Sequence, residues 1–146
     1  MVTEFIVPAL LSDGATIARV VERLAAYVDQ DVRCQSSALF TTSRTQLVSA
    51  LVNGDDAVTP VSVTLSDIAL VGPTSFVEWS VWGRFTGPAF LDDDVMIEAS
   101  GRPVTSTGAM VLRFDGDRVT DIRCYHDPAD LEAQLLGSVD RPSRAW

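Results

Sequence analysis

The chain has 146 residues, of which 47% are hydrophobic and 21% charged, as expected of a soluble domain that can bury a core. Its formal charge of −9 argues against nucleic acid and anionic membranes as partners, because both require clustered cations. No apolar run approaches the roughly 18 residues of a membrane span, and the N-terminal stretch lacks the basic residues of a signal peptide. We expect a single cytoplasmic domain over residues 1–146, with a flexible tail at 138–146.

Two features of the composition restrict the chemistry. All eleven basic residues are arginine, so no lysine is available as a Schiff base or a general base. His126 is the only histidine, which excludes a multi-histidine metal site within one chain, and we expect neither a metal nor a cofactor. Cys34 and Cys124 both lie in predicted strands. We interpret them as small buried hydrophobic residues rather than as a disulfide, which is rare in a cytoplasmic protein.

The first predicted helix begins at a cap, Ser12 or Asp13, and runs to about Tyr27. Pro8 argues against one unbroken helix from the start of the chain, so we expect the chain to begin with a short turn. Apolar residues recur on one face of the predicted helix at helical spacing. They are Ile17, Val20, Val21, Leu24 and Val28.

A short strand is predicted over 32–35, and a second amphipathic helix over 43–52, which Asn53-Gly54 ends. Four longer strands follow. The Gly72-Pro73 turn separates the first from the second, and another turn separates the third from the fourth. These strands are expected at 59–71, 74–86, 105–114 and 118–126.

The second half of the chain closes with a hairpin and a capped helix. Gly116 supplies the positive φ that the tight turn between the last two strands requires. Asp127 is expected at the N-cap of the final helix and Pro128 in its first turn. Gly137 is expected to end this helix. Helices followed by an antiparallel meander predict an α+β domain, with the helices on one face of a bent sheet and a cavity between them.

Alternation along the strands sorts side chains into two faces. In the segment 77–85, the inward face holds Val77, Trp79, Val81, Gly83 and Phe85. The opposite face carries Glu78, Ser80, Trp82 and Arg84. In the last strand Ile122, Cys124 and His126 point inward.

The run from Glu78 to Gly87 resembles the sheet of SnoaL-like polyketide cyclases, within the nuclear transport factor 2-like superfamily. The segments 101–104 and 114–119 resemble it too, and 124–128 is similar to the family's strand-to-helix ending. The resemblance spans most of the chain from about residue 13. It implies a cone-shaped α+β barrel, in which a strongly curved, mostly antiparallel sheet wraps around N-terminal helices. It also implies a deep apolar pocket and a homodimer packed through the outer sheet face.

Enzymes of this superfamily that transfer protons place carboxylates in the pocket, because desolvation raises a carboxyl pKa towards the working pH. Cys124 stands where related epoxide hydrolases and cyclases carry an aspartate on the last strand. Their Arg-x-Asp pair falls near Trp79 and Val81, and the steroid-isomerase base falls near Gln35. These departures count against epoxide hydrolysis and carboxylate-driven isomerisation.

We therefore expect an enzyme of polyketide-cyclase type that encloses an apolar, polyketide-like substrate and promotes cyclisation mainly by shape and orientation. Two alternatives stay open: a binding module for a hydrophobic small molecule without catalysis, and a carboxylate-dependent isomerase or hydrolase. The expected pocket residues are Gln35, Val77, Trp79, Val81, Met110, Ile122 and Cys124.

His126 is the best titratable candidate for catalysis, and a satisfied core or rim histidine is the alternative. Glu98 is a second candidate, which would act only if the connection 87–103 swung over the pocket as a lid. That lid would contain Asp92, Asp93, Asp94, Met96 and Ile97, although a solvated loop also explains such a charge run. On the outer face, Trp82 beside Arg84 predicts a dimer interface.

Overall fold

The computed structural model describes residues 2–11, 17–37, 39–52, 57–91 and 95–137. Four helices are present in these ranges: α1 (Val2–Leu11), α2 (Ile17–Tyr27), α3 (Arg44–Val52) and α4 (Pro128–Leu135). The strands of the main sheet are β1 (Val28–Gln35), β2 (Phe40–Thr41), β3 (Val58–Val71), β4 (Thr74–Phe85), β7 (Pro103–Asp115) and β8 (Arg118–His126). A separate hairpin pairs β5 (Ala89–Leu91) with β6 (Val95–Ile97).

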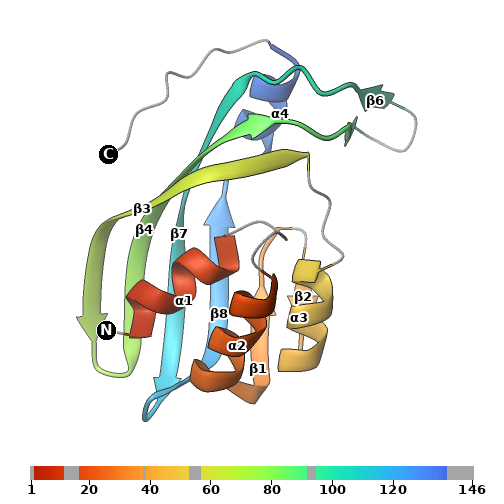
Figure 1. Cartoon of the computed structure of the whole chain (residues 1–146). Helices are drawn as coiled ribbons and strands as arrows, with labels where there is room; N and C mark the ends of the chain where they lie inside the picture. Colours follow the sequence, from red (N-terminus) through yellow and green to blue (C-terminus); the bar gives the residue numbers. More distant parts are fainter. Residues whose placement is uncertain (1, 12–16, 38, 53–56, 92–94, 138–146) are drawn as a thin grey trace.

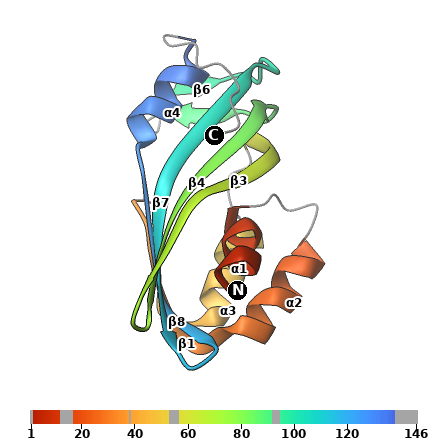
Figure 2. The same ribbon diagram turned by 90° about the vertical axis from the view of Figure 1, so that its left-hand side faces the viewer.

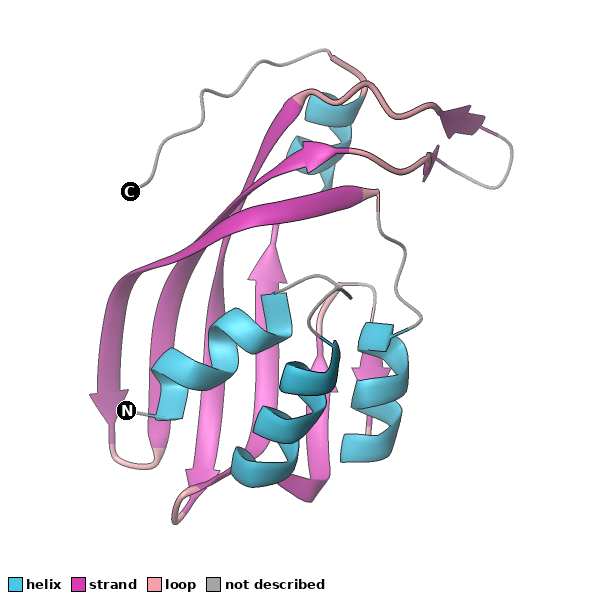
Figure 3. Ribbon diagram, in the orientation of Figure 1, coloured by secondary structure: helices cyan, strands magenta, loops and turns pink. Residues whose placement is uncertain are grey.

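The six strands form one curved, open sheet in the order β2-β1-β8-β7-β4-β3, in which only the β1·β8 pair is parallel (Figures 1 and 3). Helices α1, α2 and α3 lie against its concave face, and the long strands bend over them (Figure 2). This arrangement confirms the predicted α+β class and the strongly curved, mostly antiparallel sheet. Among the described helices, none is both long enough and apolar enough to cross a bilayer.

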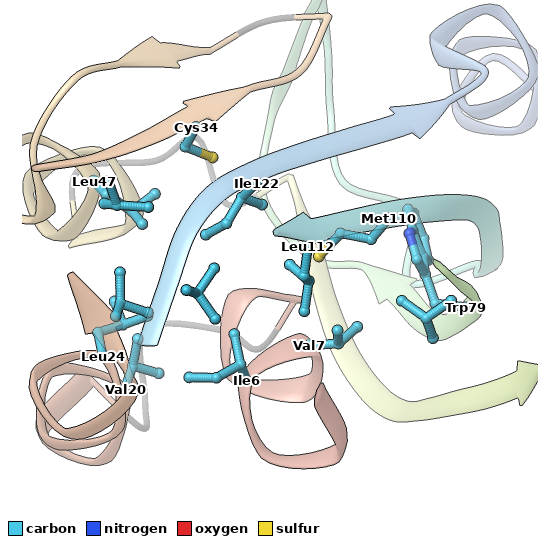
Figure 4. Packing of buried hydrophobic residues seen from close by; sticks show 14 of the residues in the cluster. Ile6, Val7, Val20, Leu24, Cys34, Leu47, Trp79, Met110, Leu112 and Ile122 are labelled. Atoms are coloured by element: carbon cyan, nitrogen blue, oxygen red, sulfur yellow. The ribbon is translucent and has the colours of Figure 1, made fainter. Parts of the chain in front are cut away.

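The core lies between the concave face of the sheet and these three helices (Figure 4). On α2, Val20 and Leu24 are buried while Arg19 and Glu22 are exposed, so the helix packs through one stripe. Val21, which the sequence predicts on the same stripe, is 38% exposed at its margin. Other fully buried members are Ile6, Val7, Val32, Leu47 and Leu112.

The prediction of an initial short turn is wrong, because the described chain starts with α1, which has Pro8 inside it and is separate from α2. Proline removes one backbone donor and crowds the preceding turn. Ile6 and Val7, directly before the proline, are completely buried in the core. Burial of this apolar helix against the sheet therefore outweighs the local cost of the proline.

The closing hairpin and helix form as predicted. Gly116 has φ 59° at the turn between β7 and β8. Asp127 caps α4, because its Oδ1 accepts the backbone N–H of Ala129 at 3.0 Å and that of Asp130 at 3.3 Å. The Asp127 carboxylate is thus engaged in holding the helix end.

A side chain of α4 completes the sheet where β8 ends. Pairing between β7 and β8 stops at Gly108–His126, so the backbone of Thr105 lies beyond the last strand partner. The Gln134 amide takes the place of a strand there: Oε1 accepts the Thr105 N–H at 2.9 Å, and Nε2 donates to the Thr105 carbonyl at 2.7 Å. These two bonds fix α4 across β7 and bring Leu131 over the concave face.

Candidate functional site

A cavity of about 300 Å³ lies on the concave face, between the sheet and the helices. This volume is at the lower end of the range for small-molecule sites, roughly 300–1,000 Å³. Of the residues predicted to line a pocket, the structure places five on its wall: Trp79, Val81, Met110, Ile122 and Cys124. His126 lies on the same wall. The helices add Leu10, Leu11, Leu47, Leu51 and Leu131.

Two other predicted pocket residues lie elsewhere. Val77 is buried in the core beside its register partner Met110, but it does not reach the cavity wall. Gln35 is exposed on the opposite face of β1, because it directly follows the inward-facing Cys34 and successive strand residues alternate. The prediction that Gln35 lines the cavity is therefore corrected.

Three strands bring Trp79, Gly108 and His126 into one row across the cavity wall. Trp79 of β4 is the register partner of Gly108 of β7, which in turn faces His126 of β8. A Cβ atom on Gly108 would lie 2.6 Å from Cζ2 of the Trp79 indole and would also meet the Tyr125 carbonyl oxygen. Glycine at this position therefore allows the indole to lie across β7 towards the next strand.

The cavity wall contains no aspartate or glutamate among the residues that the structure describes. Its polar groups are hydroxyls, thiols, the His126 imidazole and the Trp79 indole; the hydroxyls belong to Ser36 and Ser106. Trp79 is 4% exposed, and its Nε1 has no hydrogen-bond partner of normal geometry among the described residues. The site can enclose an apolar molecule and offer it neutral donors, but its wall holds no carboxylate pair for acid–base chemistry.

Both cavity thiols are held in the neutral form. Burial raises the pKa of Cys34 to about 11, with a further contribution from the neighbouring Cys124. Burial also raises the pKa of Cys124 to about 11, although the adjacent Trp79 indole N–H opposes this rise. A nucleophilic cysteine needs a lowered pKa, so neither residue is suited to covalent catalysis even though Cys124 precedes His126 on the same face.

These shifts predict a loss of stability at alkaline pH. The ordinary thiol pKa is 9.0 and the folded value is about 11, so between these limits the unfolded chain ionises first and the free energy of unfolding falls as pH rises. We expect each thiol to lower the free energy of unfolding by about 1 kcal/mol over this pH range. This is less than the full pKa shift would give, because solvent screens partly exposed groups. Urea unfolding at stepped pH would measure this effect. The Cys34→Ala/Cys124→Ala double variant should lose this slope, and an unchanged slope would contradict the assignment.

The sequence profile of the SnoaL-like domain matches residues 11–122. This chain belongs to the SnoaL-like domain family. The matched region includes α2, α3 and the strands that carry most of the cavity wall. No curated protein sequence is significantly similar to the chain.

Solved structures share the fold of this SnoaL-like protein at low sequence identity. A proposed SnoaL-like polyketide cyclase from Jannaschia sp. CCS1 has a TM-score of 0.72 and 15% identity, over 92% of this chain and 90% of that one. A protein from Catenulispora acidiphila with a ketosteroid isomerase-like fold, in complex with trimethylamine, has a TM-score of 0.69 and 18% identity, over 92% and 91%. An LEH-like epoxide hydrolase from M. tuberculosis has a TM-score of 0.62 and 19% identity, over 92% and 91%.

The structure describes the two flanks of the predicted lid, and the lid itself stays a prediction. Its flanks pair as the β5–β6 hairpin, and Ile97 packs against a small second cluster that contains Phe85 and Val104. Met96 is 54% exposed and Glu98 is exposed, and neither lines the cavity. Local pairing and the second cluster position this segment, and its described residues are absent from the cavity wall. The aspartates at 92–94 lie outside the described residues.

On the outer face, Trp82 is less exposed than the sequence suggests. The Arg84 guanidinium carbon lies 5.6 Å from the centroid of the Trp82 ring, and Arg84 also donates to the Gly101 carbonyl at 3.2 Å. Among the described residues, exposed aromatic side chains of the outer face instead include Phe40, Phe76 and Tyr125. The homodimer through this face stays a prediction.

The cavity residues that sequence reasoning missed come from the helices as well as from strands β1, β3 and β7. Leu47 and Leu51 of α3 are one helical turn apart, and Leu10 and Leu11 end α1. Their apolar character was visible, but a stripe that borders a cavity has the same spacing as one that fills a core. Gly108, in contrast, carried a usable signal, because a glycine inside a strand marks a close approach of other atoms.

Proposed function

We propose that this SnoaL-like protein is a small-molecule enzyme of polyketide-cyclase type. In this proposal an apolar, polyketide-like substrate is held folded in the cavity, and one ring closure is favoured mainly by shape and orientation. The observation that supports it is an apolar cavity with no carboxylate among its described lining residues. Holding reacting groups in position contributes up to roughly 7–11 kcal/mol, so a conventional acid–base pair is not required.

Hydrogen-bonding groups of the wall would orient the substrate. His126 lies at the end of β8, half-buried, and lines the cavity together with Ser106 and Trp79. Hydrogen bonding from this group would polarise a substrate carbonyl. Trp79 would supply a flat wall against which an extended chain folds.

A turnover assay on linear chains tests the proposal. The probes are N-acetylcysteamine thioesters of synthetic linear poly-β-ketone and polyene chains, and the readout is the ring-closed isomer of unchanged mass by liquid chromatography and mass spectrometry. We expect the wild type to accelerate closure of at least one chain and to give one dominant product where buffer gives a mixture. Glu98→Gln should preserve this rate, because Glu98 is exposed and away from the cavity.

Two other outcomes would overturn the proposal in favour of its alternatives. A chain that stays bound in native mass spectrometry but is never converted would identify a binding module. A bell-shaped dependence of the rate on pH, abolished by replacing one aspartate or glutamate, would identify a carboxylate-dependent isomerase or hydrolase.

A further inference from the structure

A recess of about 260 Å³ lies at the ends of β1 and β8. We call it the strand-end recess, and its lining residues are Gln35, Ser36, Ser37, Arg123, Cys124, Tyr125 and His126. Three of them, Ser36, Cys124 and His126, also belong to the cavity wall. The recess and the cavity therefore share part of their lining, and His126 belongs to both.

The recess exists because two neighbouring strands end at different points. The last pair of the parallel β1·β8 ladder is Gln35–Arg123. The chain then turns away towards β2, with the Ser36 N–H bonded to the Leu39 carbonyl at 2.8 Å, while β8 continues to His126. Inward and outward side chains of β8 consequently border the same opening, which is why Arg123 and His126 line it together.

Arg123 has no acidic register partner on the neighbouring strands. Its two register partners, Val111 and Gln35, are uncharged, and no carboxylate lines the strand-end recess among the described residues. Asp121, two residues earlier on the same face, instead lies between its own register partners Arg33 and Arg113. Arg123 is therefore a cation in a recess whose own described lining holds no carboxylate.

We propose that the ligand of this cavity is an amphipathic anion, whose apolar body fills the cavity and whose carboxylate or similar oxyanion lies in the strand-end recess at Arg123. Guanidinium groups bind carboxylates through paired hydrogen bonds, and the charge would stay at the surface rather than in the apolar interior. This inference names a substrate class for the proposed function, and it rests on that proposal only in taking the cavity as the substrate site.

Two fluorescent probes with one skeleton test the inference. 1-Anilinonaphthalene-8-sulfonate carries a sulfonate, and N-phenyl-1-naphthylamine lacks it. For the wild type at low salt we expect tighter binding of the sulfonate probe, with an affinity that falls as sodium chloride is added. Arg123→Gln should weaken binding of the sulfonate probe about tenfold, and it should leave the affinity for the neutral probe within about twofold of the wild-type value. The matched control is Arg113→Gln, an exposed arginine whose register partner is Asp121, and it should change neither affinity.

Displacement of the neutral probe by decanoic acid and by decan-1-ol extends the test to a carboxylate. Decanoic acid should displace it more strongly from the wild type, and this preference should vanish in Arg123→Gln. Unchanged sulfonate affinity in Arg123→Gln, with both probes still bound, would overturn the inference and leave the cavity as a ligand site. Binding as predicted without any ring closure would overturn the proposed function and leave the inference standing. If neither probe binds, both proposals fail.

Discussion

Gly108→Ala should destabilise this protein by at least about 3 kcal/mol, more than most single substitutions of this size. The added Cβ would lie 2.6 Å from the Trp79 ring and would also meet the Tyr125 carbonyl, so both a rigid aromatic group and the backbone of β8 would have to move. Interiors packed at crystal-like density accommodate such shifts poorly. Urea unfolding followed by circular dichroism would measure the loss.

A second substitution separates the two causes. Trp79→Val removes the ring that the new methyl group meets. The Gly108→Ala/Trp79→Val double variant should therefore lose less free energy of unfolding than the two single variants lose in sum. The loss that remains would report the contact with the Tyr125 carbonyl. Thr107→Ala, at an exposed neighbouring position of β7, should stay within about 0.5 kcal/mol of the wild type. Additive losses would show that Gly108 does not serve to accommodate the indole.

The fold was predictable because its elements carry strong local signals. Alternation along β4 and β8 assigned the faces of Trp79 and His126, and the hairpin at Gly116 and the cap at Asp127 follow from turn and helix-end chemistry. Pro8 misled the prediction of α1, because its local penalty is visible in sequence whereas the burial of Ile6 and Val7 is a tertiary effect.

The candidate site was predictable only in part, and the limit is physical. Strand alternation places Trp79, Met110 and Cys124 on the concave face, but it cannot say which inward side chains border a void and which, like Val77, fill the core. The error at Gln35 is one of register, since a shift of one residue exchanges the faces of a strand. The strand-end recess depends on where two strands stop relative to each other, which no local pattern encodes.

Trp79→Ala should have a large effect on both stability and function. Truncating a buried tryptophan costs about 3–5 kcal/mol, and removing an indole N–H that has no partner of normal geometry among the described residues should offset part of that loss. The cavity would widen at the row formed with Gly108 and His126, so a folded substrate would lose the flat wall against it. We expect ring closure to fall to the rate in buffer, measured alongside the urea unfolding curve.

Trp82→Ala is the matched control, three residues along the same strand and on its other face. Trp82 is half-buried beneath Arg84, so its truncation should cost about 1 kcal/mol and leave ring closure unchanged. If Trp79→Ala does not fold, Trp79→Phe keeps an aromatic wall without the N–H and should fold while giving a broader set of products. A wild-type rate and product in Trp79→Phe, or losses in Trp79→Ala no greater than those in Trp82→Ala, would mean that the indole is ordinary core and that the substrate is folded by some other surface.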